Sequence, residues 1–162
     1  MFSRIGRRGG DRLHWPGEVA HLMTFRDDRR SPQDAPGFRL AWPDDWRALL
    51  RTRANLLITG QHEARDAFMR AATPLLREPI RAVACSGPLF LDAASTLILT
   101  DLDGLDDTGQ RSLLQWVGEP RNADTQIVSL TSVRLLAPIG PNRFDPELYY
   151  RLNTIHLDVQ TA

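Results

Sequence analysis

The stretch STLILTDLDGLDDTGQRSLLQWV, residues 95–117, carries the pattern that decides the fold. Its apolar run, Thr96–Thr100, is unbroken, which predicts a strand that is buried on both faces. An acidic turn follows and leads into an expected helix over residues 107–117, with Asp106 or Asp107 near its N-cap. A buried strand, a turn and an amphipathic helix make up half of a βαβ unit, so this stretch favours a parallel sheet.

The same alternation of strands and helices continues on both sides of this stretch. We expect further strands over residues 55–59, 80–85, 125–130 and 155–159, and helices after Pro43-Asp44-Asp45, over 63–72 and over 147–152. The predicted fold class is therefore α/β, with a five-stranded, mostly parallel sheet and helices on both faces. Residues 38–162 form this core. Residues 1–37, rich in Gly, Pro, Arg and Asp, are interpreted as a basic leader with a short helix around residues 18–25.

The composition narrows the classes of protein to consider. The 162 residues are 42% hydrophobic and 25% charged, as in an ordinary globular domain. No apolar run reaches the roughly 18 residues that a membrane span requires. Cys85 is the only cysteine, which excludes an intramolecular disulfide and a multi-cysteine metal site and fits a reducing cytoplasm. The four histidines lack zinc-site spacing, so no metal is expected.

The charges are unevenly distributed, although the net charge is zero. Arginines exceed acids in residues 1–53, and acids exceed arginines in the rest of the chain. We interpret the basic head as a solvated leader and expect no nucleic-acid partner, although such a patch could bind one. All twenty basic residues are Arg and none is Lys, so any mechanism that needs an ammonium group is excluded.

Residues 144–153, FDPELYYRLN, are similar to the FRxDLYYRLN signature of sigma-54-dependent transcription activators. Residues 95–117 resemble the GTLFLDEIGEL…QxxLLxxL segment of the same family, and residues 55–60 resemble its strand before the phosphate loop. The chain thus looks like a truncated and degenerate form of the AAA+ (sigma-54 interaction) domain. The resemblance implies a Rossmann-like AAA+ core. In that family, rings of subunits hydrolyse ATP and remodel RNA polymerase bound to sigma-54.

The residues that the family uses for ATP are largely replaced in this sequence. The resemblance assigns a degenerate nucleotide site to Gly60, Arg65, Thr100, Asp101 and Thr131. The phosphate loop after Gly60 is several residues short and lacks the Lys that reaches the β- and γ-phosphates. Thr100 stands where the family has the metal-organising Asp, and Asp101 stands where it has the catalytic Glu. We expect Arg65 to be a solvated helix residue and no ATP or Mg²⁺ to be required.

The expected function is therefore that of a pseudo-ATPase, not of an enzyme. The sigma-54-contacting GAFTGA loop is absent from residues 86–95, and the chain ends at Ala162 without a segment for a lid domain. We expect protein–protein interaction in transcription regulation, either by docking on an intact sigma-54 activator through a surface that includes Tyr149, Tyr150 and Arg151, or by self-association. Arg151 matches an intersubunit arginine of the family. The alternative is a sensor that binds ATP or ADP without hydrolysis.

A different enzyme class is suggested by residues 99–105, LTDLDGL, which resemble the DxDGT motif of haloacid-dehalogenase phosphatases. In that alternative, Asp101 is the nucleophile and Asp103 is the acid/base, with Mg²⁺ between them. The Thr of the motif is replaced by Leu105, and about sixty residues are too few for the later motifs. An acidic turn that caps the next helix accounts for the same residues.

Overall fold

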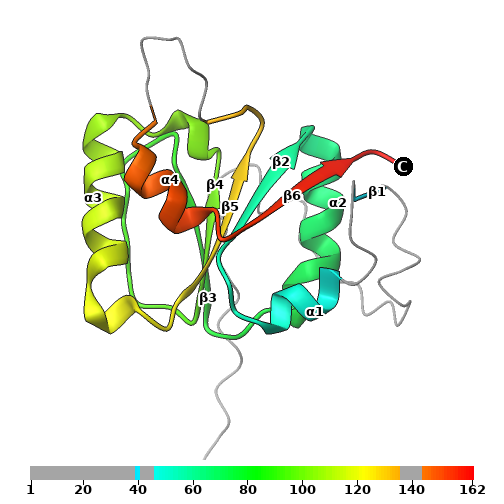
Figure 1. The fold of residues 1–162 in the computed structure, drawn as a ribbon, viewed down its shortest axis with the longest axis horizontal. Helices are drawn as coiled ribbons and strands as arrows, with labels where there is room; N and C mark the ends of the chain where they lie inside the picture. The colour runs from blue at the N-terminus through cyan, green and yellow to red at the C-terminus, as the bar shows by residue number, and fades with distance from the viewer. Residues whose placement is uncertain (1–38, 41–45, 136–143) are drawn as a thin grey trace, which may run out of the picture.

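The computed structural model describes residues 39–40, 46–135 and 144–162. They form one six-stranded sheet in the order β1-β6-β2-β5-β4-β3, shown in Figure 1. The strands are β1 (Arg39–Leu40), β2 (Leu56–Gly60), β3 (Ile80–Ala84), β4 (Thr96–Thr100), β5 (Gln126–Thr131) and β6 (Ile155–Gln160). Strands β2 to β6 are all parallel, and only β1 pairs antiparallel, with β6.

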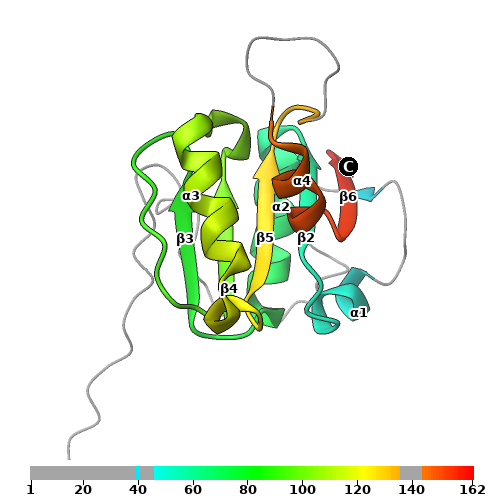
Figure 2. The ribbon, with the colours of Figure 1, turned by 60° about the vertical axis from the view of Figure 1, so that its left-hand side comes forward.

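Helices cover both faces of the sheet, because side chains of the buried strands alternate between two apolar clusters. The helices are α1 (Trp46–Arg51), α2 (His62–Ala72), α3 (Asp107–Gly118) and α4 (Pro146–Leu152). Helices α1 and α2 pack on one face, and α3 and α4 pack on the other, as Figure 2 shows from the side.

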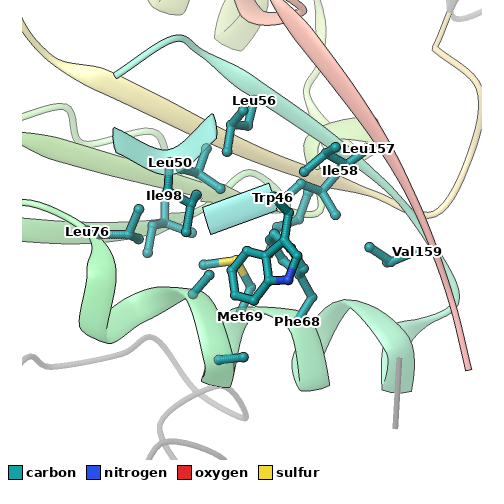
Figure 3. Close-up of a cluster of buried hydrophobic side chains, with 14 of the residues drawn as sticks. Trp46, Leu50, Leu56, Ile58, Phe68, Met69, Leu76, Ile98, Leu157 and Val159 are labelled. Carbon is teal, nitrogen blue, oxygen red and sulfur yellow. The ribbon is translucent and has the colours of Figure 1, made fainter. Parts of the chain in front are cut away.

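The cluster under α2 is centred on Trp46 and Phe68, whose ring centroids lie 5.1 Å apart (Figure 3). Ile58 and Ile98 reach it from β2 and β4, and both are fully buried. This contact joins α1 to α2 and to the sheet. Because burial of such side chains contributes about 1.5–3 kcal/mol each, the first helix is part of the folded core.

The cluster on the opposite face holds α3 and α4 next to one another. Leu113 of α3 and Leu148 of α4 are both fully buried in it. Both helices begin at an aspartate cap: Gly109 N donates to Asp106 Oδ1 (2.7 Å), and Leu148 N donates to Asp145 Oδ1 (2.9 Å).

These observations confirm the predicted α/β class and the helices on both faces. The buried strand β4 has the predicted bounds, and the other predicted strands and helices after residue 54 end within one residue of their expected limits. The sheet also contains β1, which was not predicted because two residues carry no periodicity. The leader over residues 1–37 and its helix lie outside the described residues. No helix among those described is long and apolar enough to span a bilayer.

Candidate functional site

The five residues assigned to the degenerate nucleotide site come together at one edge of the sheet. Gly60 ends β2, Thr100 ends β4 and Thr131 ends β5, and Asp101 directly follows Thr100. Strand β5 lies between β2 and β4, and because all three are parallel, their carboxyl ends share an edge. Arg65 joins them from the second turn of α2.

The junction between β2 and α2 leaves no room for a phosphate loop. One residue, Gln61, separates Gly60 from the first residue of α2. Gly60 has φ +150°, and a Cβ at this position would lie 2.2 Å from the carbonyl oxygen of Val159 on β6. Gly60 is thus required by the close approach of two strands. A phosphate loop needs several successive backbone N–H groups to surround an anion, and the junction has no such segment.

Arg65 is buried, so its interpretation as a solvated helix residue is wrong. Its side chain is 6% exposed, and its Nε has no hydrogen-bond partner within the part of the chain that the structure describes. The same is true of the Thr100 Oγ1, in a residue that is 7% exposed. Buried polar groups nearly always have partners, so these two atoms are the most unusual polar groups of this edge.

Asp66, next to Arg65, was not singled out from the sequence. Burial raises the pKa of this carboxyl, and the nearby Asp101 raises it further, while His62, Arg70 and Arg65 oppose the shift. The His62 Nε2 lies 3.1 Å from Asp66 Oδ2.

Asp101 and Asp103 lie in the tight turn that follows β4. Asp101 has a left-handed backbone, with φ 52° and ψ 49°, a conformation that is uncommon for a residue other than glycine. Asp103 accepts hydrogen bonds from Thr131 Oγ1 (2.9 Å) and from Ser132 N (3.3 Å). Asp103 thereby ties the turn after β4 to the end of β5. No group of three or more metal-binding side chains occurs within the described ranges.

The carboxyl edge is rich in carboxylates. Acidic side chains on the turns after β2, β4 and β5, and on the first five residues of the helices that follow, are Glu63, Asp66, Asp101, Asp103, Asp106, Asp107, Asp145 and Glu147. The arginines described over the same residues are Arg65, Arg111 and Arg134. Because like charges repel, this excess of negative charge disfavours the binding of a triphosphate.

Helix α4 places the residues of the YYRLN segment on the opposite side of the sheet from α2. Tyr150 is 71% exposed, and its ring contacts that of the partly buried Tyr149 edge-on, with centroids 5.5 Å apart. Arg151 forms an ion pair with Glu147 (2.9 Å). Asn55 Nδ2 donates to the Arg151 carbonyl oxygen (2.9 Å) and fixes the end of the helix to β2.

Two other residues with potentially reactive side chains are Cys85 and His156. Cys85 is 2% exposed, and burial, with Asp101 and Asp103, raises the pKa of its thiol to about 12. A thiol with that pKa is almost entirely protonated at neutral pH and is a poor nucleophile. His156 lies on the exposed side of β6, where its Nε2 is 2.8 Å from Thr59 Oγ1.

The architecture defines the class of fold. Parallel strands in the order β6-β2-β5-β4-β3, with helices on both faces and polar residues at the carboxyl edge, form a Rossmann-like α/β core.

Solved structures support this fold. The chain is similar to NtrX from Brucella abortus, with a TM-score of 0.50 and 16% identity over 70% of this chain and 35% of that chain. NtrX in complex with ATP gives a TM-score of 0.49 at 16% identity, over 69% of this chain and 34% of that one. Drosophila ORC bound to AT-rich DNA and Cdc6 gives 0.44 at 15% identity, over 70% and 51%. The sequence matches no protein-family model and no curated protein. At 16% identity and a TM-score of 0.50, the likeness to the first of these structures shows the fold alone.

Proposed function

We propose that the chain is a non-catalytic, sigma-54-activator-like AAA+ module that acts in transcription regulation by binding another protein. The observation that carries this proposal is the direct passage of β2 into α2 through Gln61 alone. Without a phosphate loop and without any Lys, the chain lacks the groups that position and stabilise a transferring phosphoryl group. The acidic carboxyl edge disfavours the same ligand.

The binding surface proposed here is the exposed side of α4. Tyr150 presents a large aromatic ring to solvent, and Arg151 is exposed beside it. Tyr and Arg are the residue types that most often dominate protein interfaces. The similarity of this helix to the YYRLN segment makes the AAA+ domain of an intact sigma-54 activator the partner to test at this surface. Self-association of the chain is a separate route.

Two measurements test the proposal. Purified protein with Mg²⁺ and ATP should release phosphate no faster than buffer, and hydrolysis well above that rate would overturn the non-catalytic assignment. Binding to the AAA+ domain of a sigma-54 activator should be weakened at least about tenfold by Tyr150→Ser, as expected for a central aromatic contact. Phe90→Ser is the matched control, because Phe90 is equally exposed (77%) but lies outside α4.

A nucleotide sensor without hydrolysis is the second candidate. It is favoured by the Arg65 Nε and the Thr100 Oγ1, which have no partner within the described ranges. A bound anion could accept a hydrogen bond from the Arg65 Nε, and a water or an Mg²⁺-bound nucleotide could contact the Thr100 Oγ1. Calorimetric titration with ATP and with ADP, each with and without Mg²⁺, tests it. Heat of binding that Arg65→Met removes would place this candidate first, and no heat would exclude it.

A further inference from the structure

The sheet ends at β3, and one side of this strand has no partner in the part of the chain that the structure describes. Strand β3 pairs only with β4, and Cys85 N, just beyond it, donates to Thr100 O (2.9 Å). Backbone groups alternate in direction along a strand, so those of Ala82 and Ala84 point away from β4. Within the described ranges no hydrogen bond reaches them.

An unusual connection leaves this edge open. Parallel neighbours such as β3 and β4 are usually joined by a helix, which covers the strand. Here residues 85–95 form no helix, and Figure 2 shows them on the β3 side of α3. Leu89 and Leu91 of this connection pack against the cluster under α3, whereas Phe90 between them is 77% exposed.

An ion pair between β3 and the connection leaves the strand without net charge. Arg81 Nη1 of β3 is 3.4 Å from Asp92 Oδ2 of the connection, so the one charge of the strand is paired within the chain. The other side chains of β3 are Ile, Val and Ala. Natural edges are usually protected by unpaired charges, by proline within the strand or by a bulge, and this five-residue strand has none of them.

We propose that β3 pairs antiparallel with β3 of a second copy of this chain, across a twofold axis at Ala82. Ile80 of each copy then lies opposite Ala84 of the other, and Arg81 lies opposite Val83, so no like charges face one another. The Arg81–Asp92 pair keeps the surface neutral, which suits an identical partner better than a charged peptide. Phe90 is exposed on the connection that follows β3, and in this pairing it buries apolar area against the other copy.

This surface is separate from α4, at the opposite end of the strand order from β6. Self-association is one route of the proposed function, and the β3 dimer rests on that route and gives it a location. It does not depend on binding of an activator through α4, nor on the absence of ATP hydrolysis. Those two properties are measured separately, so each proposal can fail alone.

Sedimentation velocity of the full chain over a concentration series tests the proposal. The wild type should dimerise, and Ala82→Pro should raise the dissociation constant at least about tenfold. This proline removes only an outward N–H, so the ladder to β4 is kept, and an edge strand tolerates it. Phe90→Glu, at an exposed position, is a second variant that cannot fail through misfolding of the core. Tyr150→Ser should leave the dimer unchanged.

Amide exchange completes the test. In the dimer, the N–H groups of Ala82 and Ala84 should become protected as concentration rises. A wild type that stays monomeric up to about 1 mM would overturn the proposal, because such an affinity is too weak for a functional dimer. A dimer that neither Ala82→Pro nor Phe90→Glu weakens would overturn it as well. Protection of these amides in the monomer would also overturn the proposal, because another part of the same chain would then cover the edge.

Discussion

Replacing Arg65 with Met should make the folded protein more stable. The result distinguishes an arginine that stabilises the fold from one whose partner is a ligand. Arg65 is only 6% exposed, and its Nε has no hydrogen-bond partner within the described ranges. Met has a similar length and a nearly equal helix propensity, so α2 should not be disturbed. The substitution removes one unsatisfied donor and one charge.

The magnitude follows from two opposing contributions. A buried donor without a partner costs about 1–3 kcal/mol, and Met abolishes that cost. The lost attraction between Arg65 and the half-buried Asp66 is worth at most about 1 kcal/mol in a partly solvated site. The net gain is therefore about 1 kcal/mol, which raises the melting temperature by roughly 2–4 °C in a chain of this size.

Urea unfolding, followed by circular dichroism, measures the difference directly. Arg70→Met is the matched control: Arg70 is an exposed arginine of the same helix that also acts on Asp66, and its loss should change the free energy of unfolding by less than about 0.5 kcal/mol. If Arg65→Met instead destabilises the chain by more than the control, the guanidinium has a partner that stabilises the fold, and the structural argument is refuted. If ATP–Mg²⁺ raises the stability of the wild type but not that of Arg65→Met, the partner of the guanidinium is the nucleotide.

Three further changes test other parts of the structure. Gly60→Ala should destabilise the fold by at least about 3 kcal/mol in urea unfolding, because its Cβ would meet the Val159 carbonyl oxygen at 2.2 Å; a loss below about 1 kcal/mol would contradict that contact. Asp66→Asn should stabilise the protein near pH 7 but not at low pH. Burial raises the pKa of Asp66 in the folded protein, so the stability of the wild type falls as the pH rises from the unfolded pKa through the folded one. Melting curves of both proteins across this pH range should show the difference. A less stable Asn variant at pH 7 would mean that the contact with His62 outweighs burial. Cys85 should react with a thiol reagent at neutral pH only as fast as the protein unfolds, since it is 2% exposed with a pKa of about 12; rapid labelling of the native state would disprove this.

The sequence predicted those parts of the fold in which local pattern and burial agree. Strand β4 was located to the residue, because all five of its side chains are buried and none interrupts the apolar run. The start of α3 was predicted because an aspartate at the N-cap is a local signal, and Asp106 accepts the hydrogen bond from Gly109 N that the signal implies. Such features depend on a few neighbouring residues, which the sequence displays directly.

The parts that were missed depend on contacts between distant residues. The burial of Arg65 follows from the packing of α2 on the sheet, while its charge alone predicted solvent exposure. The bond from Thr131 Oγ1 to Asp103 joins residues 28 positions apart and carries no local signal. Phe90 carries no local signal for its exposure, because it stands between Leu89 and Leu91 in an unbroken apolar run and only its two neighbours pack against the core.

The distribution of paired and unpaired polar groups bears on which part of the chain can have a function. Along α4 the polar groups are paired: Asp145 N donates to Gln110 Oε1 (2.6 Å), and Asn153 Nδ2 donates to the Tyr149 hydroxyl (2.7 Å). These bonds and the buried Leu148 are sufficient to hold the helix, so packing alone explains why those residues match the activator segment. Packing does not explain Tyr150, which is 71% exposed and whose loss would cost the fold little. An exposed aromatic side chain that the fold does not require is available for contact with another protein, and for that reason the binding surface that we propose is on α4 and not at the carboxyl edge.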